Sequence, residues 1–123
     1  MKEPIQAVQV LDMIPAAVVT ADGNGTGVDL KEYEGDVAFV MDAGAGSGDM
    51  TLDCKIQDSA DNSSFADVTG GAFTQVTTSA SVQKIVLKSD EIRRYVRAVK
   101  DVGGTSPSFA LSIKGLGFKK YKS

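Results

Sequence analysis

Few side chains in this chain of 123 residues could carry out chemistry, and histidine is absent. Histidine is the commonest general base and metal ligand, and it activates the nucleophile in Ser-His and Cys-His systems. Its absence removes the usual hydrolase mechanisms. The carboxylates of Glu32, Glu34 and Asp36 remain, but alternating acidic residues before a strand are typical of a solvated surface rather than of a catalytic pair. We therefore predict no catalytic residues and no enzymatic activity.

Two segments raise the question of a bound ligand. The glycine-rich residues 43–49, AGAGSGD, have no following Lys-Ser/Thr pair and enter a strand rather than a helix, which argues against a phosphate-binding loop. The turn with Asp58, Asp61 and Asn62 offers the oxygen atoms that calcium prefers, but it lacks a regular ligand spacing and a distal Glu. Capping of the turn is favoured, with calcium as the alternative, and we predict no metal and no cofactor.

The strand that contains the only cysteine shows strict alternation. Leu52, Cys54 and Ile56 point to one face of residues 51–57, and polar residues point to the other. Cys54 has no partner for a disulfide within the chain, and its apolar neighbours predict a buried structural thiol rather than a reactive one.

Similar short alternating runs predict a β protein. Phe109, Leu111 and Ile113 alternate with smaller or polar residues, and turn clusters separate the runs. We predict an all-β fold, a single-domain β-sandwich or jelly roll over residues 1–123 with about eight short antiparallel strands. Residues 43–49 are predicted to be a hairpin tip, residues 70–81 a flexible connection and residues 89–94 a single helical turn.

The beginning of the chain is predicted to be a short N-terminal arm over residues 1–15. Pro15 separates an apolar set from the sandwich, and such a set is too short to fold alone. It must therefore pack on its own domain, on a sister subunit or on a larger assembly, and this candidate interface consists of Ile5, Val8, Val10 and Leu11.

A second candidate interface lies near residue 95. Strand alternation places Arg93, Tyr95 and Arg97 on one face, where they could bind an acidic partner or stack on a sugar. An exposed strand face without a partner explains the same pattern.

Length and composition narrow the class of protein. A chain of this size forms one core, no apolar run reaches the ~20 residues of a membrane span, and the first residues lack the layout of a signal peptide. We expect a protein made in a cytoplasm that has no membrane partner.

Charge is divided unevenly along the chain. Residues 1–83 carry 3 basic and 13 acidic side chains, whereas residues 84–123 carry 10 basic and 3 acidic ones. Neighbouring antiparallel strands that neutralise each other are the favoured explanation, and complementary faces in an assembly are the alternative. Nucleic acid is not expected as a partner, because the basic region lacks interleaved aromatic residues.

Most of the chain, about residues 28–118, resembles a known group of proteins. The order YEGDVAFVMDAGAGSGDMTLDCKIQDSADNSSFADV, a polar stretch and RRYVRAVKDVGGTSPSFALSIKGLG is similar to small head decoration or cement proteins of tailed bacteriophages. The resemblance implies a β subunit without catalytic residues that binds the outside of an assembled capsid and bridges capsid subunits. It implies the major capsid protein as partner, a homo-oligomer (a trimer is favoured, a dimer is the alternative), and a place on the exterior of the virion.

A second likeness gives an alternative. KIQDSADNSSFADV followed by RRYVRAV is also similar to galactose-binding-like jelly rolls, which would make the chain a carbohydrate-binding module. Such modules present aromatic side chains to the sugar, but this chain has no Trp and places Phe39, Phe65 and Phe109 at predicted core positions.

Overall fold

Nine strands form two antiparallel β-sheets in the computed structural model, which describes residues 8–119. The four-stranded sheet has the order β1 (Val8–Val19), β9 (Phe109–Lys119), β4 (Tyr33–Ala43) and β7 (Ser81–Lys88). The five-stranded sheet has the order β2 (Gly23–Asn24), β8 (Tyr95–Gly103), β5 (Thr51–Ser59) and β6 (Ala66–Ala72), and β3 (Val28–Asp29) also pairs with β8.

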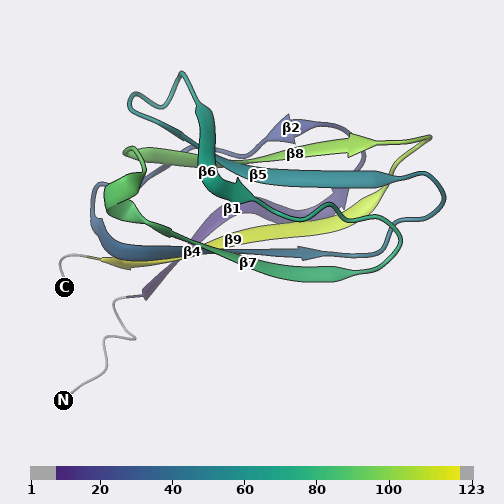
Figure 1. Ribbon diagram of the computed structural model, residues 1–123, viewed down its shortest axis with the longest axis horizontal. Helices are drawn as coiled ribbons and strands as arrows, with labels where there is room; N and C mark the ends of the chain where they lie inside the picture. Colours follow the sequence, from purple (N-terminus) through teal and green to yellow (C-terminus); the bar gives the residue numbers. More distant parts are fainter. Residues whose placement is uncertain (1–7, 120–123) are drawn as a thin grey trace, which may run out of the picture.

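The two sheets lie on each other as two layers (Figure 1). This confirms the predicted all-β sandwich, with nine strands in place of about eight. One turn of 3-10 helix, η2 (Ser89–Glu91), lies between β7 and β8, at the start of the predicted helical turn. Within residues 8–119 there is no helix long and apolar enough to cross a membrane.

The core lies between the layers, and most strands contribute alternate residues to it. Phe39 and Met41 of β4 face Leu52 and Ile56 of β5 across it, and all four side chains are fully buried. Phe109, Leu111 and Ile113 of β9 are buried as well. The alternation that predicted the strands therefore also identified the inner faces of β5 and β9.

The sequence predicted a hairpin tip at the glycine segment after β4, but the structure shows a different connection. It carries the chain from the four-stranded sheet to the five-stranded one, because β4 pairs with β7 and β9 whereas β5 pairs with β6 and β8. The Gly46 amide donates to the Thr77 carbonyl at 2.7 Å, and a Cβ on Gly46 would lie 2.6 Å from the ring of Phe109. Glycine is required by this close approach at the end of the sandwich.

The predicted arm over residues 1–15 is wrong for its second half. Residues 8–15 belong to β1, which pairs with β9 from Val8 to Val19, and Leu11 and Met13 are buried in the core. Pro15 does not end the strand, because it lies in an irregularity of the register on an edge strand, where a proline removes no ladder hydrogen bond. Residues 1–7 lie outside the described part of the chain.

Residues 70–81 were predicted to be a flexible connection, but several of them pair with neighbouring strands or are buried. Its first residues belong to β6, and Phe73 and Val76 are buried. The Val76 amide donates to Leu52 and the Leu52 amide donates to Val76, so this segment continues along the edge of β5 after β6 has ended.

Candidate functional site

The outer face of the four-stranded sheet carries an unusual set of exposed apolar side chains. Among the described residues, all the large apolar side chains that are exposed lie on β1, β7 and β9 of this sheet. We call them the apolar face, and they are Val10, Val18, Val82, Val86, Leu116 and Phe118. Exposed apolar side chains gathered on one face of a small protein mark an interaction surface more often than single exposed residues do.

The strand register aligns several of these residues in one row. Val10 of β1 lies opposite Leu116 of β9, Leu116 opposite Ala38 of β4, and Ala38 opposite Val86 of β7. The row therefore crosses all four strands without a charged residue. We call it the apolar row, and it joins three members of the apolar face.

The next row has charges at its ends. Asp12 of β1 lies opposite Lys114 of β9, followed by Val40 of β4 and Lys84 of β7. The Lys114 ammonium pairs with the Asp12 carboxylate. Lys84 has no ion-pair partner among residues 8–119. A free positive charge on β7 thus lies at one end of this row, and a carboxylate on β1 lies at the other.

The outer face of the five-stranded sheet is polar, and its side chains bind one another. Asp67 accepts hydrogen bonds from Lys55 at 3.1 Å and from Gln57 at 2.8 Å. Arg97 donates two hydrogen bonds to the amide oxygen of Gln57, and its guanidinium lies 4.2 Å from the ring centre of Phe65. The chain itself therefore supplies the partners of these groups.

The structure separates the three residues of the predicted arginine–tyrosine face. Tyr95 and Arg97 alternate with the buried Val96 on β8, as expected, but Arg93 precedes this strand. The Arg93 side chain and amide make four hydrogen bonds of 2.9–3.0 Å with Asp58. Arg93 is thus bound by its own chain. Strand alternation does not apply to it, because it lies before the first residue of β8.

The predicted N-terminal contact set is divided by β1. Val10 is 67% exposed and belongs to the apolar face, and Val8 is partly exposed beside it, opposite Phe118. Leu11 is buried in the core and cannot serve as an exposed contact. Ile5 lies outside the described residues.

Sequence reasoning missed the other members of the apolar face, although a signal was present. Apolar residues occur at both parities of β9, since Leu116 and Phe118 alternate with Gly115 and Gly117 rather than with polar residues. Apolar side chains on both sides of a strand indicate burial on both faces. In β9 the inner parity is taken by glycine at this end, so the apolar side chains point outward.

The uneven charge along the chain is partly neutralised by ion pairs within the fold. Of the five ion pairs in the described residues, four join a basic residue after position 83 to an acidic residue before it. These four are Arg93–Asp58, Arg94–Asp29, Lys114–Asp12 and Lys119–Glu32. This supports the favoured explanation of the charge pattern.

The turn that raised the calcium alternative is capped by its own carboxylate. Asp61 accepts hydrogen bonds from the amides of Ser63 and Ser64, both at 3.0 Å, and from the Ser59 hydroxyl at 2.8 Å. The amide of Ser64 contributes most to the lowered pKa of Asp61. No group of three or more acidic or cysteine residues within positions 8–119 is arranged to hold a metal ion.

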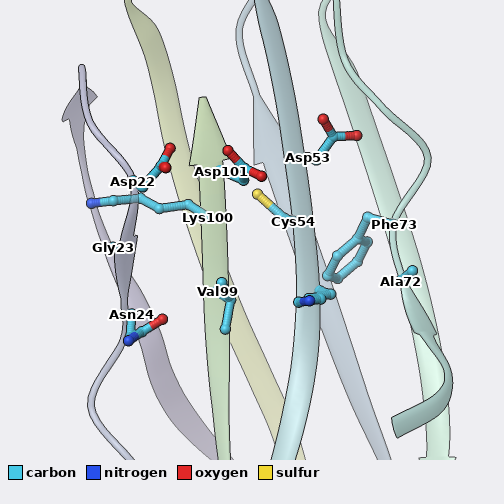
Figure 2. A pocket seen from close by; sticks show the side chains of 11 residues that line it. Asp22, Gly23, Asn24, Asp53, Cys54, Ala72, Phe73, Val99, Lys100 and Asp101 are labelled. Carbon is cyan, nitrogen blue, oxygen red and sulfur yellow. The ribbon is translucent and has the colours of Figure 1, made fainter. Parts of the chain in front are cut away.

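A hollow of about 420 Å³ lies at the five-stranded sheet (Figure 2). The carboxylates of Asp22, Asp53 and Asp101 lie at one end of it. A hydrogen bond with Asp22 and the negative charge of Asp22 raise the pKa of Asp101. Burial raises the pKa of the Cys54 thiol to about 12, so this group stays protonated at neutral pH, as expected for a structural cysteine.

Comparisons with known proteins show the fold. No family model and no curated protein matches the chain. Among solved structures, PBSX exported protein XepA has a TM-score of 0.59 and 13% identity, over 100% of this chain and 40% of that chain. The SPBc2 prophage-derived protein YomS has a TM-score of 0.53 and 11% identity, over 89% of this chain and 91% of that chain. This chain therefore spans less than half of the first protein and nearly all of the second.

Proposed function

We propose that this chain is a non-enzymatic structural protein of a bacteriophage particle, which binds the outer surface of the assembled capsid and bridges neighbouring capsid subunits. The observation that carries the proposal is the apolar face, because an exposed apolar sheet face in a small domain is suited to the protein–protein contacts of an assembled particle, with a capsid subunit or with a sister copy. The phage-derived proteins that share the fold support the phage context.

The mechanism is thermodynamic. A protein that binds only the assembled lattice stabilises that state in proportion to its affinity and occupancy. A subunit that touches two neighbouring capsid proteins adds contacts across their boundary, so the lattice resists dissociation without any covalent step.

The alternative of a carbohydrate-binding module has less support. Its candidate aromatic residues are Phe65 and Tyr95, and Phe65 is half-buried rather than part of the core as the sequence predicted. Arg97 lies over the ring of Phe65, and Arg94 lies 5.0 Å from the ring centre of Tyr95. Each ring is thus covered on one side by an arginine of the chain, and a sugar would have to compete with that contact.

Binding to capsids tests the proposal. The purified chain is mixed with assembled capsids and, separately, with unassembled capsid protein, and bound protein is measured by co-sedimentation. We expect saturable binding to assembled capsids only, and a higher temperature of capsid disruption at saturation. Equal binding to unassembled capsid protein, or no binding to capsids, would contradict the proposal, and binding on a glycan array would favour the carbohydrate module.

A further inference from the structure

We propose that a second copy of this chain covers the apolar face, so that two four-stranded sheets pack face to face around a twofold axis parallel to their strands. The inference deepens the proposed function by giving the assembling unit, and its test needs no capsid. It rests on three features of the face: the order of its rows, the charges at the ends of one row and its area.

The apolar row is complementary to itself under this symmetry. A twofold axis along the strands, between β9 and β4, places β1 of one copy over β7 of the other and keeps each row in register. Val10 then faces Val86 of the partner subunit, and Leu116 faces Ala38 of the partner subunit. The contact is isologous, so each pairing occurs twice.

The charged row next to the apolar row is also complementary to the same row of the second copy. The same axis places Asp12 on β1 opposite Lys84 of the partner subunit on β7. Lys84 has no ion-pair partner within residues 8–119, and the side chain of Asp12 is 57% exposed beside Lys114. Each dimer would contain two such pairs, which fix the register of the two sheets rather than supply most of the affinity.

The whole outer surface of the four-stranded sheet, of which the apolar face is a part, is large enough for a stable dimer. Its strands contain 12, 11, 11 and 8 residues. At about 3.3 Å per residue and about 4.8 Å between strands, they cover on the order of 650 Å² per copy. Two such faces bury about 1,300 Å², within the usual range of about 1,200–2,000 Å² for specific protein interfaces. Stacked sheets in sandwiches pack in this manner.

Sedimentation equilibrium on the full chain tests the inference. We expect a dimer that dissociates measurably at micromolar concentrations. Leu116→Glu, at the centre of the apolar row, should weaken dimerisation at least tenfold, a loss of about 1.4 kcal/mol. Thr69→Glu, which adds the same charge to an exposed position of β6 in the other sheet, should leave the dimer unchanged. Both variants should unfold at the temperature of the wild-type monomer, since both positions are exposed.

A second pair of variants tests the proposed symmetry. Lys84→Glu places a negative charge opposite Asp12 of the partner and should weaken the dimer more than Lys88→Glu, which makes the same charge change elsewhere on β7. Equal effects of these two variants would overturn the twofold arrangement. A wild-type monomer at every concentration, or a dimer that survives Leu116→Glu, would overturn the inference itself. A monomer whose capsid binding is lost on Leu116→Glu would identify the capsid as the occupant and overturn it while the proposed function stands.

Discussion

The outer faces of the two sheets have the same strand geometry, but they differ in whether their side chains find partners within the chain. On the five-stranded sheet, Gln57 connects Arg97 to Asp67, and Arg97 covers Phe65. On the outer face of the four-stranded sheet, Val10, Leu116 and Val86 are exposed instead. Many side chains of the first face find partners within the chain, and the second face leaves apolar area exposed. This difference is the reason that the proposed assembly uses the four-stranded sheet.

Truncation at the N-terminus should have the largest effect, because it removes inner as well as outer residues of β1. Deleting residues 1–13 takes Leu11 and Met13 out of the core, and loss of a buried Leu or Met side chain costs about 2–5 kcal/mol each. Small domains have about 5–15 kcal/mol of stability in total. We expect the truncated chain to be largely unfolded by circular dichroism. A folded truncation product would show that β1 is a dispensable arm.

Two phenylalanines separate the inner and outer faces of the four-stranded sheet. Phe39 is fully buried, and Phe39→Ala should lower the free energy of unfolding by about 3–5 kcal/mol. Phe118 is 40% exposed on the apolar face, so Phe118→Ala should cost the isolated subunit only about 1–2 kcal/mol. Urea titration at a concentration where the chain is monomeric measures both. Similar losses for the two variants would mean that Phe118 also belongs to the core.

These inner residues are the part of the fold that the sequence predicted well. Period-two alternation identified Leu52, Cys54 and Ile56 as core residues, because burial of one sheet face imposes that pattern directly. The pattern does not say which strands pair. It therefore predicts a hairpin at the glycine segment before Met50, although this segment joins the two sheets. The passage of the chain from one sheet to the other depends on contacts between residues far apart in sequence, such as Gly46 with Thr77.

The candidate site was predicted only in part, for a related reason. Val8 and Val10 were identified through their apolar character, but Leu116 and Val86 were not, because a residue's face depends on the register with neighbouring strands. For Arg93 the alternation gives no placement, because it applies only within β8, which begins at Tyr95.

Two ion pairs of the five-stranded sheet should differ in strength. Asp58 has a side-chain exposure of 13% and binds both the amide and the guanidinium of Arg93. Asp58→Ala leaves these donors without their acceptor and should cost about 2–3 kcal/mol in thermal or urea unfolding. Asp67→Ala removes an exposed pair with Lys55 and should cost less than about 1 kcal/mol. Equal costs would show that the Asp58 pair is no more than a surface contact.

The smallest effect is expected at the acidic end of the hollow in Figure 2. The pKa of Asp101 is raised, with the hydrogen bond to Asp22 as the first cause and the negative charge of Asp22 as the second. An acid with a raised pKa in the folded state binds its proton more tightly there, so its ionisation at neutral pH opposes folding. Asp101→Asn should therefore slightly raise the melting temperature at pH 7, and this gain should disappear as the pH falls below the ordinary value of 3.8.

The matched control for this variant is Asp90→Asn, at an exposed position of η2 that belongs neither to the lining of the hollow nor to the apolar face. It removes the same charge from the chain but not from the Asp22–Asp101 pair. If both variants change the melting temperature by the same amount at every pH, the effect reflects overall charge, and the account of the hollow is wrong.

An electron-microscopy map of capsids saturated with this protein tests the central claim most directly. The resolution must be sufficient to distinguish the four-stranded sheet from the five-stranded one. We expect density for the protein on the outside of the capsid, with the apolar row from Val10 to Val86 covered by the same row of a second copy. Absence of the protein from the capsid exterior, or an apolar row that faces solvent in the assembled particle, would contradict the account.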